Sequence, residues 1–335
     1  MPELDIVATG PVDSAAAEVL APYGPLIVAS EGNETALLPL MARAQALIVR
    51  GGGVATKTMI AAAPHLRVIG RSGAGYDSVD VRAATERGIP LVYVPGVGAR
   101  AVAEAGVALI FALAKNLFYW DREAKAGHWK SRYQSNPKDI AGSVIGIVGL
   151  GNIGSALAEL LRPSHPRLLA YDPVVPLQKG LDAGVELTTL EELLRSSDFV
   201  SLHAPLNAET RGMMNHASLK LMRPEAFLIN LARGGLIESL DVLYEFLRDG
   251  RIAGAALDVF EPEPPDCAHP IFQLPNLIAS PHSLGMTEGT MRQIFKSMAA
   301  DMAAVLDGQR PRFVVNPEVL ESAGSSQKQG SSCEH

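Results

Sequence analysis

The sequence predicts an α/β fold of two domains, each built on a doubly wound parallel sheet. Short apolar segments, typical of buried strands, alternate with helix-like segments along most of the chain. One such series, about 95 residues long, is complete before a glycine-rich motif near residue 150 opens a second series. A chain of 335 residues is also long enough for two separate cores.

The composition is that of an ordinary globular protein, with 47% hydrophobic and 19% charged residues. Its 29 basic and 36 acidic residues give a net charge of −7, so we expect neither nucleic acid nor an anionic membrane as a partner. Cys267 and Cys333 lie in a proline-rich loop and near the C-terminus, which predicts neither a disulfide framework nor a metal site. The first residues, MPELDIV, do not resemble a secretory signal, so we expect a cytoplasmic protein.

The first series of segments predicts a domain of five short strands separated by helices. Far along the chain, a helix-like segment at 290–306 leads to residues 313–315, which could rejoin this domain. We therefore expect a discontinuous first domain formed by residues 1–98 and 286–320. Residues 321–335 are rich in Ser, Gln, Gly and Lys and are expected to be a disordered tail. The five predicted strands comprise residues 4–9, 26–29, 46–50, 67–69 and 91–94.

Residues 101–118 are mostly apolar, and their only charged side chains are Glu104 and Lys115. A membrane span is one interpretation of such a segment. Its richness in alanine, its single occurrence and the internal glutamate favour a helix buried between protein surfaces. We expect this helix to open the second domain, at 99–285.

A glycine-rich motif follows the first strand of that second domain. The buried strand 144–148 is followed by Gly149, Gly151 and Gly154, which have GxGxxG spacing, and then by a helix-like segment. The three glycines would permit a tight turn, close approach of a pyrophosphate, and close packing of helix and strand. The helix start would also offer free N–H groups to the phosphates. Because the chain has 31 glycines, the spacing alone is a weak signal.

A second signal makes dinucleotide binding the favoured interpretation. The apolar strand 168–172 ends in Asp172, whose carboxylate would accept hydrogen bonds from the adenosine ribose and repel a 2′-phosphate. The alternative is that Asp172 merely opens a turn before Pro173. Residues 173–176 carry no cation to hold a 2′-phosphate, so the predicted cofactor is NAD rather than NADP. The remaining predicted strands of this domain comprise residues 199–202, 227–231, 255–259 and 277–280.

Three of these strands are followed by residues able to do acid–base chemistry, namely Arg233, Glu263 and His282. Since ligands bind beyond the carboxyl ends of strands in an open parallel sheet, we expect the three to meet at the cofactor site. Arg233 could pair with a substrate carboxylate, His282 could supply a proton, and Glu263 could hold the imidazole and favour its charged form. The set suits reduction of a 2-oxo acid. Each residue taken singly has a structural alternative, as a surface charge or a solvated loop residue.

Five segments stand in order along the chain, namely VGLGNIG, HAPLNAETRG (203–212), NLARGGLIE (230–238), GAALDVFEPEP (254–264) and SPHSLGMT (280–287). Together they make the chain resemble the D-isomer-specific 2-hydroxyacid dehydrogenases. The resemblance implies a Rossmann coenzyme domain inserted in a flavodoxin-like substrate domain, and a homodimer built around the coenzyme domain. It also implies Arg233, Glu263 and His282 as the catalytic set.

The same resemblance assigns further cofactor residues. It places Asn152 and Ile153 at the pyrophosphate, and Ala232 and Asp258 near the nicotinamide. We expect no metal ion.

Within the family, IVRGG (48–52) and GRSGAGYDSVD (70–80) are most similar to D-3-phosphoglycerate dehydrogenases. In those enzymes, arginines at these two places face the substrate phosphate, and here they are Arg50 and Arg71. The alternative is that Arg71 only pairs with Asp77 or Asp80. Because the chain stops soon after Pro317, we expect a form of this enzyme without the regulatory domain.

A small loop follows the second of these arginines. Gly73, Ala74 and Gly75 would present backbone N–H groups to the substrate carboxylate, which requires small residues.

The chain departs from the family pattern near the expected substrate site. The usual Asn after strand 91–94 is Gly98, a usual Ser is Ala101, and Ser283 and Leu284 follow the catalytic histidine. These departures leave the identity of the 2-hydroxy acid open, with hydroxypyruvate or glyoxylate reduction as the alternative to phosphoglycerate oxidation. A second alternative is an NAD-sensing binding protein, because C-terminal-binding co-repressors resemble the same family.

Overall fold

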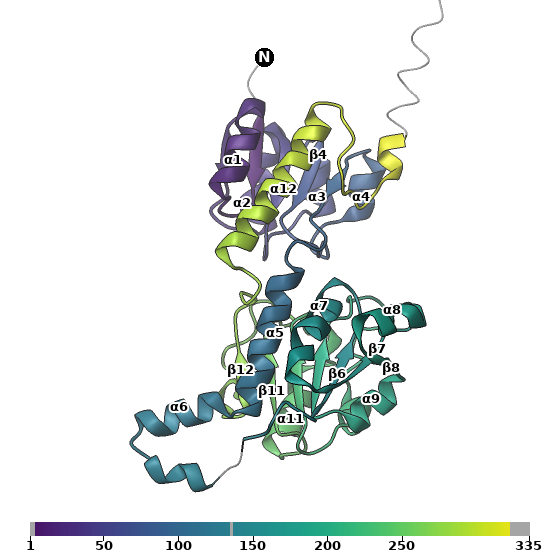
Figure 1. Ribbon diagram of the computed structural model, residues 1–335. Coiled ribbons are helices and arrows are strands. Elements are labelled where there is room, and N and C mark those ends of the chain that lie inside the picture. Colours follow the sequence, from purple (N-terminus) through teal and green to yellow (C-terminus); the bar gives the residue numbers. More distant parts are fainter. Residues whose placement is uncertain (1–3, 135–136, 322–335) are drawn as a thin grey trace, which may run out of the picture. The chain divides into compact units, whose positions relative to one another are not determined.

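The computed structural model describes residues 4–134 and 137–321 (Figure 1). This part of the chain divides into two compact units, one with the residues up to Gly98 and from Thr287 onward, the other with Ala99–Met286. Cys333 and the predicted tail 321–335, apart from its first residue, lie outside the described residues.

The first unit contains a five-stranded parallel sheet in the order β2-β1-β3-β4-β5. Helices α1 and α12 cover one face, and α2, α3 and α4 cover the other. Contact with α12 is so close that a Cβ on Gly70 would lie 2.2 Å from the Met302 sulfur. The elements are β1 Asp5–Ala8, α1 Ser14–Leu20, β2 Leu26–Val28, α2 Glu34–Leu37, β3 Ala44–Val49, α3 Lys57–Ala61, β4 Val68–Arg71, α4 Val81–Glu86, β5 Leu91–Val92 and α12 Glu288–Leu306.

The segment after α12 returns to this sheet. Val314 forms an antiparallel bridge with Val92, and the Val315 N–H donates to the Leu91 carbonyl at 2.8 Å. The side chain of the buried Asn316 accepts the Leu91 N–H at 2.8 Å. Residues 314–316 are therefore hydrogen-bonded to β5.

The second unit contains a seven-stranded parallel sheet in the order β12-β11-β10-β9-β6-β7-β8. Helices α5 and α7 pack on one face, and α9, α10 and α11 on the other (Figure 1). The strand order reverses between β6 and β9. The strands are β6 Val144–Val148, β7 Arg167–Tyr171, β8 Glu186–Leu187, β9 Phe199–Leu202, β10 Phe227–Asn230, β11 Gly254–Leu257 and β12 Leu277–Ala279, and the helices are α5 Ala99–Ala114, α6 Leu117–Lys125, α7 Asn152–Leu161, α8 Leu177–Ala183, α9 Leu190–Ser196, α10 His216–Leu219 and α11 Leu240–Arg248.

The prediction of one buried helix over 101–118 is wrong at its C-terminal end. Helix α5 ends at Ala114, and Asn116 adopts a left-handed conformation with φ 48° that starts a new helix, α6. Leu117 and Phe118 consequently stay 57% and 55% exposed. Among the described helices, none alone is long and apolar enough to cross a membrane. One pair, α5 and α6, meets these criteria of length and composition together, but the two helices are bent by 58° relative to each other.

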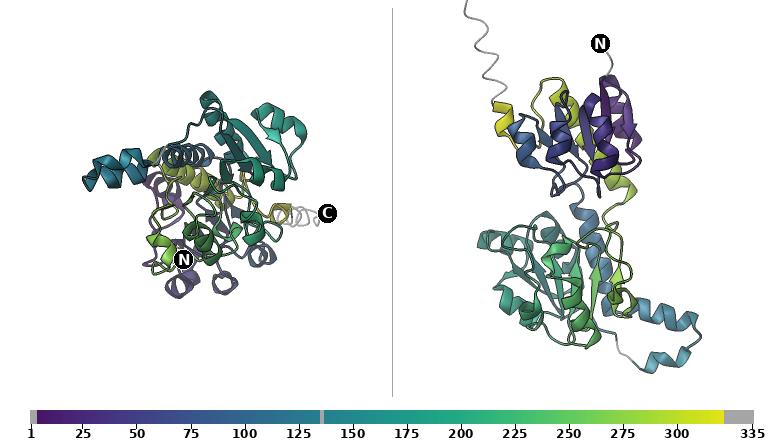
Figure 2. Two further views of the ribbon diagram at one scale, coloured as in Figure 1. Left: turned by 90° about the horizontal axis from the view of Figure 1, so that it is seen from below. Right: turned by 180° about the vertical axis from the view of Figure 1, so that it is seen from behind.

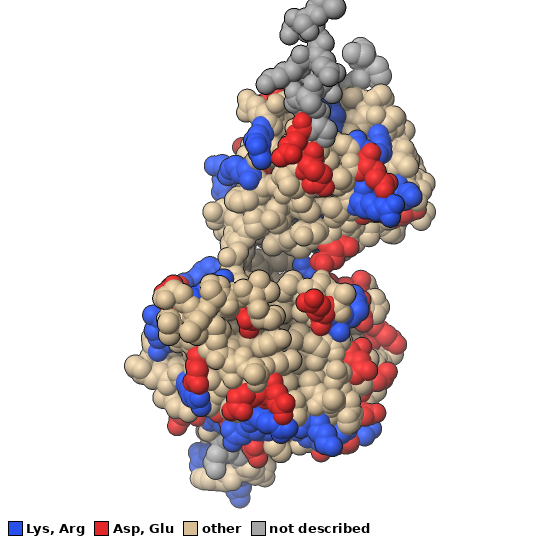
Figure 3. All heavy atoms as spheres, turned by 90° about the vertical axis from the view of Figure 1, so that its right-hand side faces the viewer, with Lys and Arg blue, Asp and Glu red and all other residues tan. Residues whose placement is uncertain are grey.

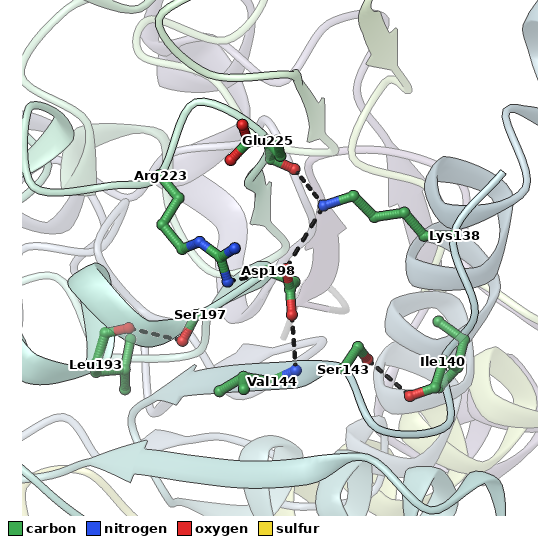
Figure 4. A network of polar contacts seen from close by, with 9 residues as sticks. All are labelled: Lys138, Ile140, Ser143, Val144, Leu193, Ser197, Asp198, Arg223 and Glu225. Atoms are coloured by element: carbon green, nitrogen blue, oxygen red, sulfur yellow. Dashed lines mark hydrogen bonds and ion pairs between the residues drawn. The ribbon is translucent and has the colours of Figure 1, made fainter. Parts of the chain in front are cut away.

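The amino-terminal edge of the second sheet is closed by a polar network (Figure 4). Asp198, just before β9, accepts the Val144 N–H at 2.9 Å and pairs with Lys138 and Arg223 at 3.5 and 3.2 Å. Lys138 also donates to the Glu225 carbonyl at 2.8 Å. The network ties the starts of β6 and β9 to the turn before β10, at the edge opposite the loops that carry the predicted site.

Charged side chains of both signs lie beside one another on the face drawn in Figure 3. Lys and Arg alternate there with Asp and Glu over both units instead of gathering into a basic surface. This mixture agrees with the small net negative charge of −7.

Candidate active site

The glycine-rich loop between β6 and α7 has the geometry that a dinucleotide phosphate requires. Gly149 has φ +94°, and a Cβ there would lie 2.8 Å from the His203 carbonyl oxygen. A Cβ on Gly154 would lie 2.1 Å from the Gly149 oxygen, so these two glycines permit the turn and the close helix. By contrast, a Cβ on Gly151 would meet nothing within 4 Å. The middle glycine therefore faces open space, where a pyrophosphate could approach.

Helix α7 starts at this open space. Asn152 and Ile153 are its first two residues, and its N-cap, Gly151, has no side chain that could cap the first turn. N–H groups at a helix start attract anions. The chain's own residues thus fit the pyrophosphate assignment, which stays a prediction.

Asp172 lies directly after β7 and is hydrogen-bonded to the glycine-rich loop. One carboxylate oxygen, Oδ2, accepts the Leu150 N–H at 2.8 Å, and Oδ1 accepts the N–H groups of Val174 and Val175 at 3.0 and 3.3 Å. These contacts bear on both interpretations of Asp172, the ribose contact and the turn before Pro173. Asp172 shapes the turn after its strand, and it also lies at the loop where the ribose contact is predicted.

Arg233 is placed by a buried asparagine that the sequence analysis did not single out. Asn230, the last residue of β10, is fully buried, accepts the Ala232 N–H at 3.1 Å and donates to the Arg233 carbonyl at 2.9 Å. The Arg233 guanidinium in turn donates to the Ala232 carbonyl at 2.7 Å. Ala232 itself is buried. The side chain of Asn230 thus fixes the backbone that turns Arg233 away from the sheet.

Two glycines let the loop after β11 lie directly on the loop after β10. A Cβ on Gly234 would lie 2.0 Å from the Phe260 carbonyl carbon, and one on Gly235 would lie 2.0 Å from a Glu261 carboxylate oxygen. At Gly234 the clash is with backbone, so no larger residue fits there, and at Gly235 the Glu261 side chain would have to move. The segment that leads to Glu263 is consequently held against the segment that carries Arg233.

Glu263 and His282 form the central contact of the site, with Oε2 and Nδ1 2.8 Å apart. The other glutamate oxygen, Oε1, accepts the Phe260 N–H at 2.9 Å. Partial burial would by itself raise the pKa of Glu263, but the hydrogen bonds from His282 and Phe260, with the positive charge of Arg233, lower this pKa below its ordinary value. The carboxylate is therefore ionised at neutral pH and can orient the imidazole through Nδ1, which leaves Nε2 for a substrate.

The loop that carries His282 is held by Asp258. This buried carboxylate accepts the Ser280 hydroxyl at 2.6 Å and the N–H groups of Ser283 and Leu284 at 3.0 and 3.2 Å. His282 itself has φ 53°, a left-handed conformation that non-glycine residues adopt only when their surroundings fix it. The predicted contact of Asp258 with the nicotinamide stays a prediction, and its visible role is to hold this loop.

A second histidine at the same edge of the sheet was missed by the sequence analysis. His203 directly follows β9, beside Gly149, and its Nε2 lies 2.8 Å from the hydroxyl of the buried Ser201. Burial lowers the pKa of His203 to about 4, so the ring is neutral at physiological pH. Among the described residues its buried Nδ1 has no hydrogen-bond partner. His203 opens the segment HAPLNAETRG, but the segment does not reveal its burial, which depends on packing from both neighbouring strands.

The two arginines predicted to bind the substrate lie on neighbouring strands of the first unit. Arg71 ends β4 and is paired in register with Val49, which directly precedes Arg50. Arg50 donates to the Pro11 carbonyl at 2.7 Å, lies 5.1 Å from the Phe295 ring centroid, and has a buried Nε without a hydrogen-bond partner. Burial lowers the pKa of Arg50, but the guanidinium stays charged at neutral pH. Both cations thus lie at the carboxyl end of the sheet.

The small loop after Arg71 leaves the sheet at the same edge. Gly73 has φ +153°, and its carbonyl accepts the Val94 N–H at 3.0 Å, so the loop that contains Ala74 and Gly75 is tied to the segment after β5. Asp80, one of the two alternative partners considered for Arg71, accepts the Ala83 N–H at 2.8 Å and caps α4.

No group of three or more His, Cys, Asp or Glu side chains in the described residues is arranged to hold a metal ion.

Comparison with known proteins identifies the family. Residues 107–283 match the NAD-binding domain of the D-isomer specific 2-hydroxyacid dehydrogenases. The chain is 36% identical over 312 residues to a D-3-phosphoglycerate dehydrogenase of Methanocaldococcus jannaschii, covering 93% of this chain and 59% of that protein. It is 37% identical over 263 residues to a glyoxylate reductase of Korarchaeum cryptofilum, covering 78% and 79% of the two chains.

A solved structure shows the same architecture. The D-lactate dehydrogenase of Aquifex aeolicus, complexed with NAD and lactic acid, has a TM-score of 0.84 and 25% identity and covers 95% of this chain and 98% of its own. The predicted fold class and the predicted cofactor, NAD, are confirmed. The chain spans less than two thirds of the length of the phosphoglycerate dehydrogenase it matches. With more than half of its length matched by the family's NAD-binding domain, this protein belongs to the D-isomer specific 2-hydroxyacid dehydrogenases.

Proposed function

We propose that the protein is an NAD-dependent dehydrogenase that interconverts a D-2-hydroxy acid and the corresponding 2-oxo acid. The observation that carries this proposal is the 2.8 Å contact of Glu263 with His282, in a loop packed against the one that bears Arg233. When bound, the nicotinamide supplies or accepts the hydride. The sheet brings the acid–base pair and the cation to the carboxyl ends of its strands, on the same edge as the glycine-rich loop.

The three residues divide the remaining chemistry among them. Arg233 binds the substrate carboxylate and polarises the adjacent carbonyl, since a guanidinium can form two parallel hydrogen bonds with a carboxylate. His282 delivers a proton from Nε2 to the carbonyl oxygen in reduction and removes it in oxidation. Glu263 holds the imidazole through Nδ1 and stabilises its charged form.

The favoured substrate is a phosphoglycerate-like acid with an anionic group distant from the reacting carbon. Arg50 supports this assignment, because its guanidinium is partly buried and its Nε has no hydrogen-bond partner among the described residues. Arg71, at the end of the adjacent strand β4, provides a second cation at the carboxyl end of the first unit's sheet. Reduction of hydroxypyruvate or glyoxylate is the second candidate, favoured by the similarity to glyoxylate reductases.

A panel of substrates tests the proposal. Initial rates of NADH oxidation are measured with phosphohydroxypyruvate, hydroxypyruvate, glyoxylate and 2-oxoglutarate. We expect turnover with at least one of them and the highest kcat/KM with the phosphorylated acid. His282→Ala should lower turnover by roughly 10²- to 10⁴-fold and leave NADH binding largely unchanged. Binding of NADH without turnover of any acid would instead favour the NAD-sensing alternative.

We further propose that two copies associate through the second unit, and that the protein works in the cytoplasm. Helix α6 and the 3-10 helix Trp129–Tyr133 extend beyond the sheet of their unit (Figures 1 and 2). No residue of α6 is buried, and Trp129 and Tyr133 are 69% and 78% exposed. Large exposed aromatic side chains grouped in this way are characteristic of protein interfaces.

The dimer is tested by sedimentation equilibrium of the wild type and of Trp129→Ser with Tyr133→Ser. We expect a dimer for the wild type and a monomer, or a much weaker dimer, for the double variant. Leu181→Ser, at an apolar residue on α8 that is 64% exposed, is the matched control and should keep the wild-type mass. A wild-type monomer at micromolar concentration would contradict the proposal.

A further inference from the structure

We propose that the ion pair between Arg211 and Glu261 is a positioning device that sets Glu263 against His282 and Arg233. The proposal rests on the proposed function, because it concerns the geometry of the same site. Arg211 lies in the loop after β9, and Glu261 lies in the loop after β11, two residues before Glu263. The His282 imidazole is hydrogen-bonded to Glu263 and to neither Arg211 nor Glu261.

The pair joins two loops across a third. The Arg211 Nη1 lies 2.8 and 2.9 Å from the two carboxylate oxygens of Glu261. A Cβ on Gly235, in the loop after β10, would lie 2.0 Å from one of those oxygens and 3.0 Å from Nη1. The ion pair therefore lies directly over the Gly235 α-carbon, two residues from Arg233.

The arginine end of the pair is held firmly. The Asn207 side chain accepts the N–H groups of Glu209 and Thr210 at 2.9 and 3.0 Å, and the Arg211 N–H donates to the Asn207 carbonyl at 3.0 Å. The Gly212 N–H then donates to the Gly235 carbonyl at 2.8 Å. Arg211 thus projects from a compact turn that is itself hydrogen-bonded to the loop under the ion pair.

The glutamate end leads to the acid–base pair. Between Glu261 and Glu263 lies one residue, Pro262, and the Phe260 N–H on the other side of Glu261 donates to Glu263 Oε1 at 2.9 Å. A shift of Glu261 therefore moves both the backbone and the hydrogen-bond donor that fix Glu263. The charged groups around the acid–base pair are Arg233, which acts on Glu263, and Asp258, which holds the loop of His282.

Stability alone does not explain this arrangement. The side chains of Arg211 and Glu261 are 57% and 47% exposed, and half-exposed ion pairs contribute little to folding. Catalytic geometry is more sensitive, because a displacement of about 1 Å can reduce a rate by as much as about 100-fold. The expected consequence of breaking the pair is therefore a loss of turnover with little loss of stability.

A double-mutant cycle tests the proposal, with Arg211→Ala, Glu261→Gln and the double variant. We expect each single variant to lower kcat roughly 3- to 30-fold and to move the alkaline limit of the reductive direction to lower pH, with NADH affinity and the unfolding midpoint nearly unchanged. If the two residues act as one unit, the double variant should lose no more than the worse single variant. Arg211→Lys keeps the charge and should recover part of the loss.

A similar ion pair remote from the site provides the control. Arg167 and Glu186 are 2.9 Å apart and 56% and 59% exposed, and they lie at the starts of β7 and β8. Arg167→Ala and Glu186→Gln should leave kcat and the pH profile unchanged. Wild-type kcat and pH profile in both Arg211→Ala and Glu261→Gln, or additive losses in the double variant, would overturn the proposal.

A second readout separates this inference from the proposed function. The titration of the His282 ring is followed by NMR, with His282→Gln to assign the resonance. In Arg211→Ala the ring should titrate at lower pH than in the wild type, because Glu263 is displaced from it. If the wild type reduces none of the four acids, the proposed function fails, and the titration still decides whether the ion pair positions Glu263. An unchanged titration would refute the positioning role.

Discussion

His282 Nδ1 lies 2.8 Å from Glu263 Oε2, and each partner is fixed by contacts outside the pair. The Phe260 N–H holds the other oxygen of Glu263, and Asp258 accepts the Ser280 hydroxyl before the histidine and the Ser283 N–H after it. The imidazole is therefore oriented before any ligand binds. This arrangement allows specific expectations for variants of the site.

The first prediction concerns Glu263→Gln, which keeps the shape of the side chain and removes its charge. The pKa of Glu263 is lowered partly by its hydrogen bond with His282, so by reciprocity the carboxylate favours the charged ring. Reduction requires protonated His282, and its alkaline limit should move to lower pH in the variant. Oxidation requires the neutral ring, and its acid limit should move in the same direction.

The measurement is the pH profile of kcat/KM in both directions for the wild type and Glu263→Gln. Glu245→Gln, on the exposed side of α11, serves as the charge-matched control and should leave both profiles in place. If neither limit moves in Glu263→Gln, the assignment of the acid–base pair is wrong.

The second prediction concerns Asp172→Ala and cofactor choice. We expect the wild type to prefer NADH over NADPH and the variant to show a narrower preference, because both ribose acceptors and the repulsion of a 2′-phosphate are lost. Because Asp172 also accepts the Leu150 N–H, affinity for NADH should fall as well, by about 10- to 100-fold. The kcat/KM values for both cofactors measure this. A wild type that prefers NADPH would refute the prediction.

The third prediction concerns the substrate and the variants Arg50→Ala and Arg71→Ala. Each should weaken transition-state binding of a phosphorylated acid by about 1.5 to 3 kcal/mol, the scale of a charged hydrogen bond, and leave glyoxylate nearly unaffected. Arg82→Ala is the control in the same unit, since Arg82 is largely exposed and pairs with Glu86 along α4. Equal losses on both substrates would show that Arg50 and Arg71 are structural.

The fourth prediction concerns stability and the buried His203. Its pKa is about 4 in the folded protein and 6.5 as the ordinary value, so the unfolded chain takes up a proton first as the pH falls. The contribution of neutral His203 to the free energy of unfolding should therefore be fully present above about pH 6.5. It should decrease as the pH falls and level off below about pH 4, with a total loss of at most roughly 3 kcal/mol.

His203→Gln can retain the contact with Ser201 and cannot titrate in this range. Urea unfolding midpoints measured between pH 4 and pH 7 should decrease less steeply toward acid for this variant than for the wild type. His65→Gln, at an exposed histidine, should follow the wild-type curve. Parallel curves for all three proteins would contradict the prediction.

The sequence alone determined the fold class, because strands buried on both faces of a parallel sheet must be continuous apolar runs. Residues 199–202 were predicted as a strand with the bounds that β9 has, and residues 144–148 match β6. The glycine-rich loop was also readable, since a Cβ on Gly154 would clash with the Gly149 oxygen within the motif itself. The family resemblance depended on the same local segments.

Local patterns failed where the structure depends on neighbours or on a single backbone angle. Strand β8, Glu186–Leu187, was not predicted, because its two residues carry too little apolar pattern and pair only with the edge of β7. The end of α5 was misplaced because Asn116 adopts a left-handed conformation that composition does not reveal.

The polar framework of the site was likewise decided only by tertiary structure. Asp258 and the ion pair of Arg211 with Glu261 join loops that follow different strands. The contacts of Asp258 exist only once β11 and β12 lie side by side, and the ion pair exists only once β9, β10 and β11 do, and no spacing along the chain encodes that proximity. The sequence therefore identified the residues proposed to do the chemistry, and the packing of the sheet determined which residues hold them in place.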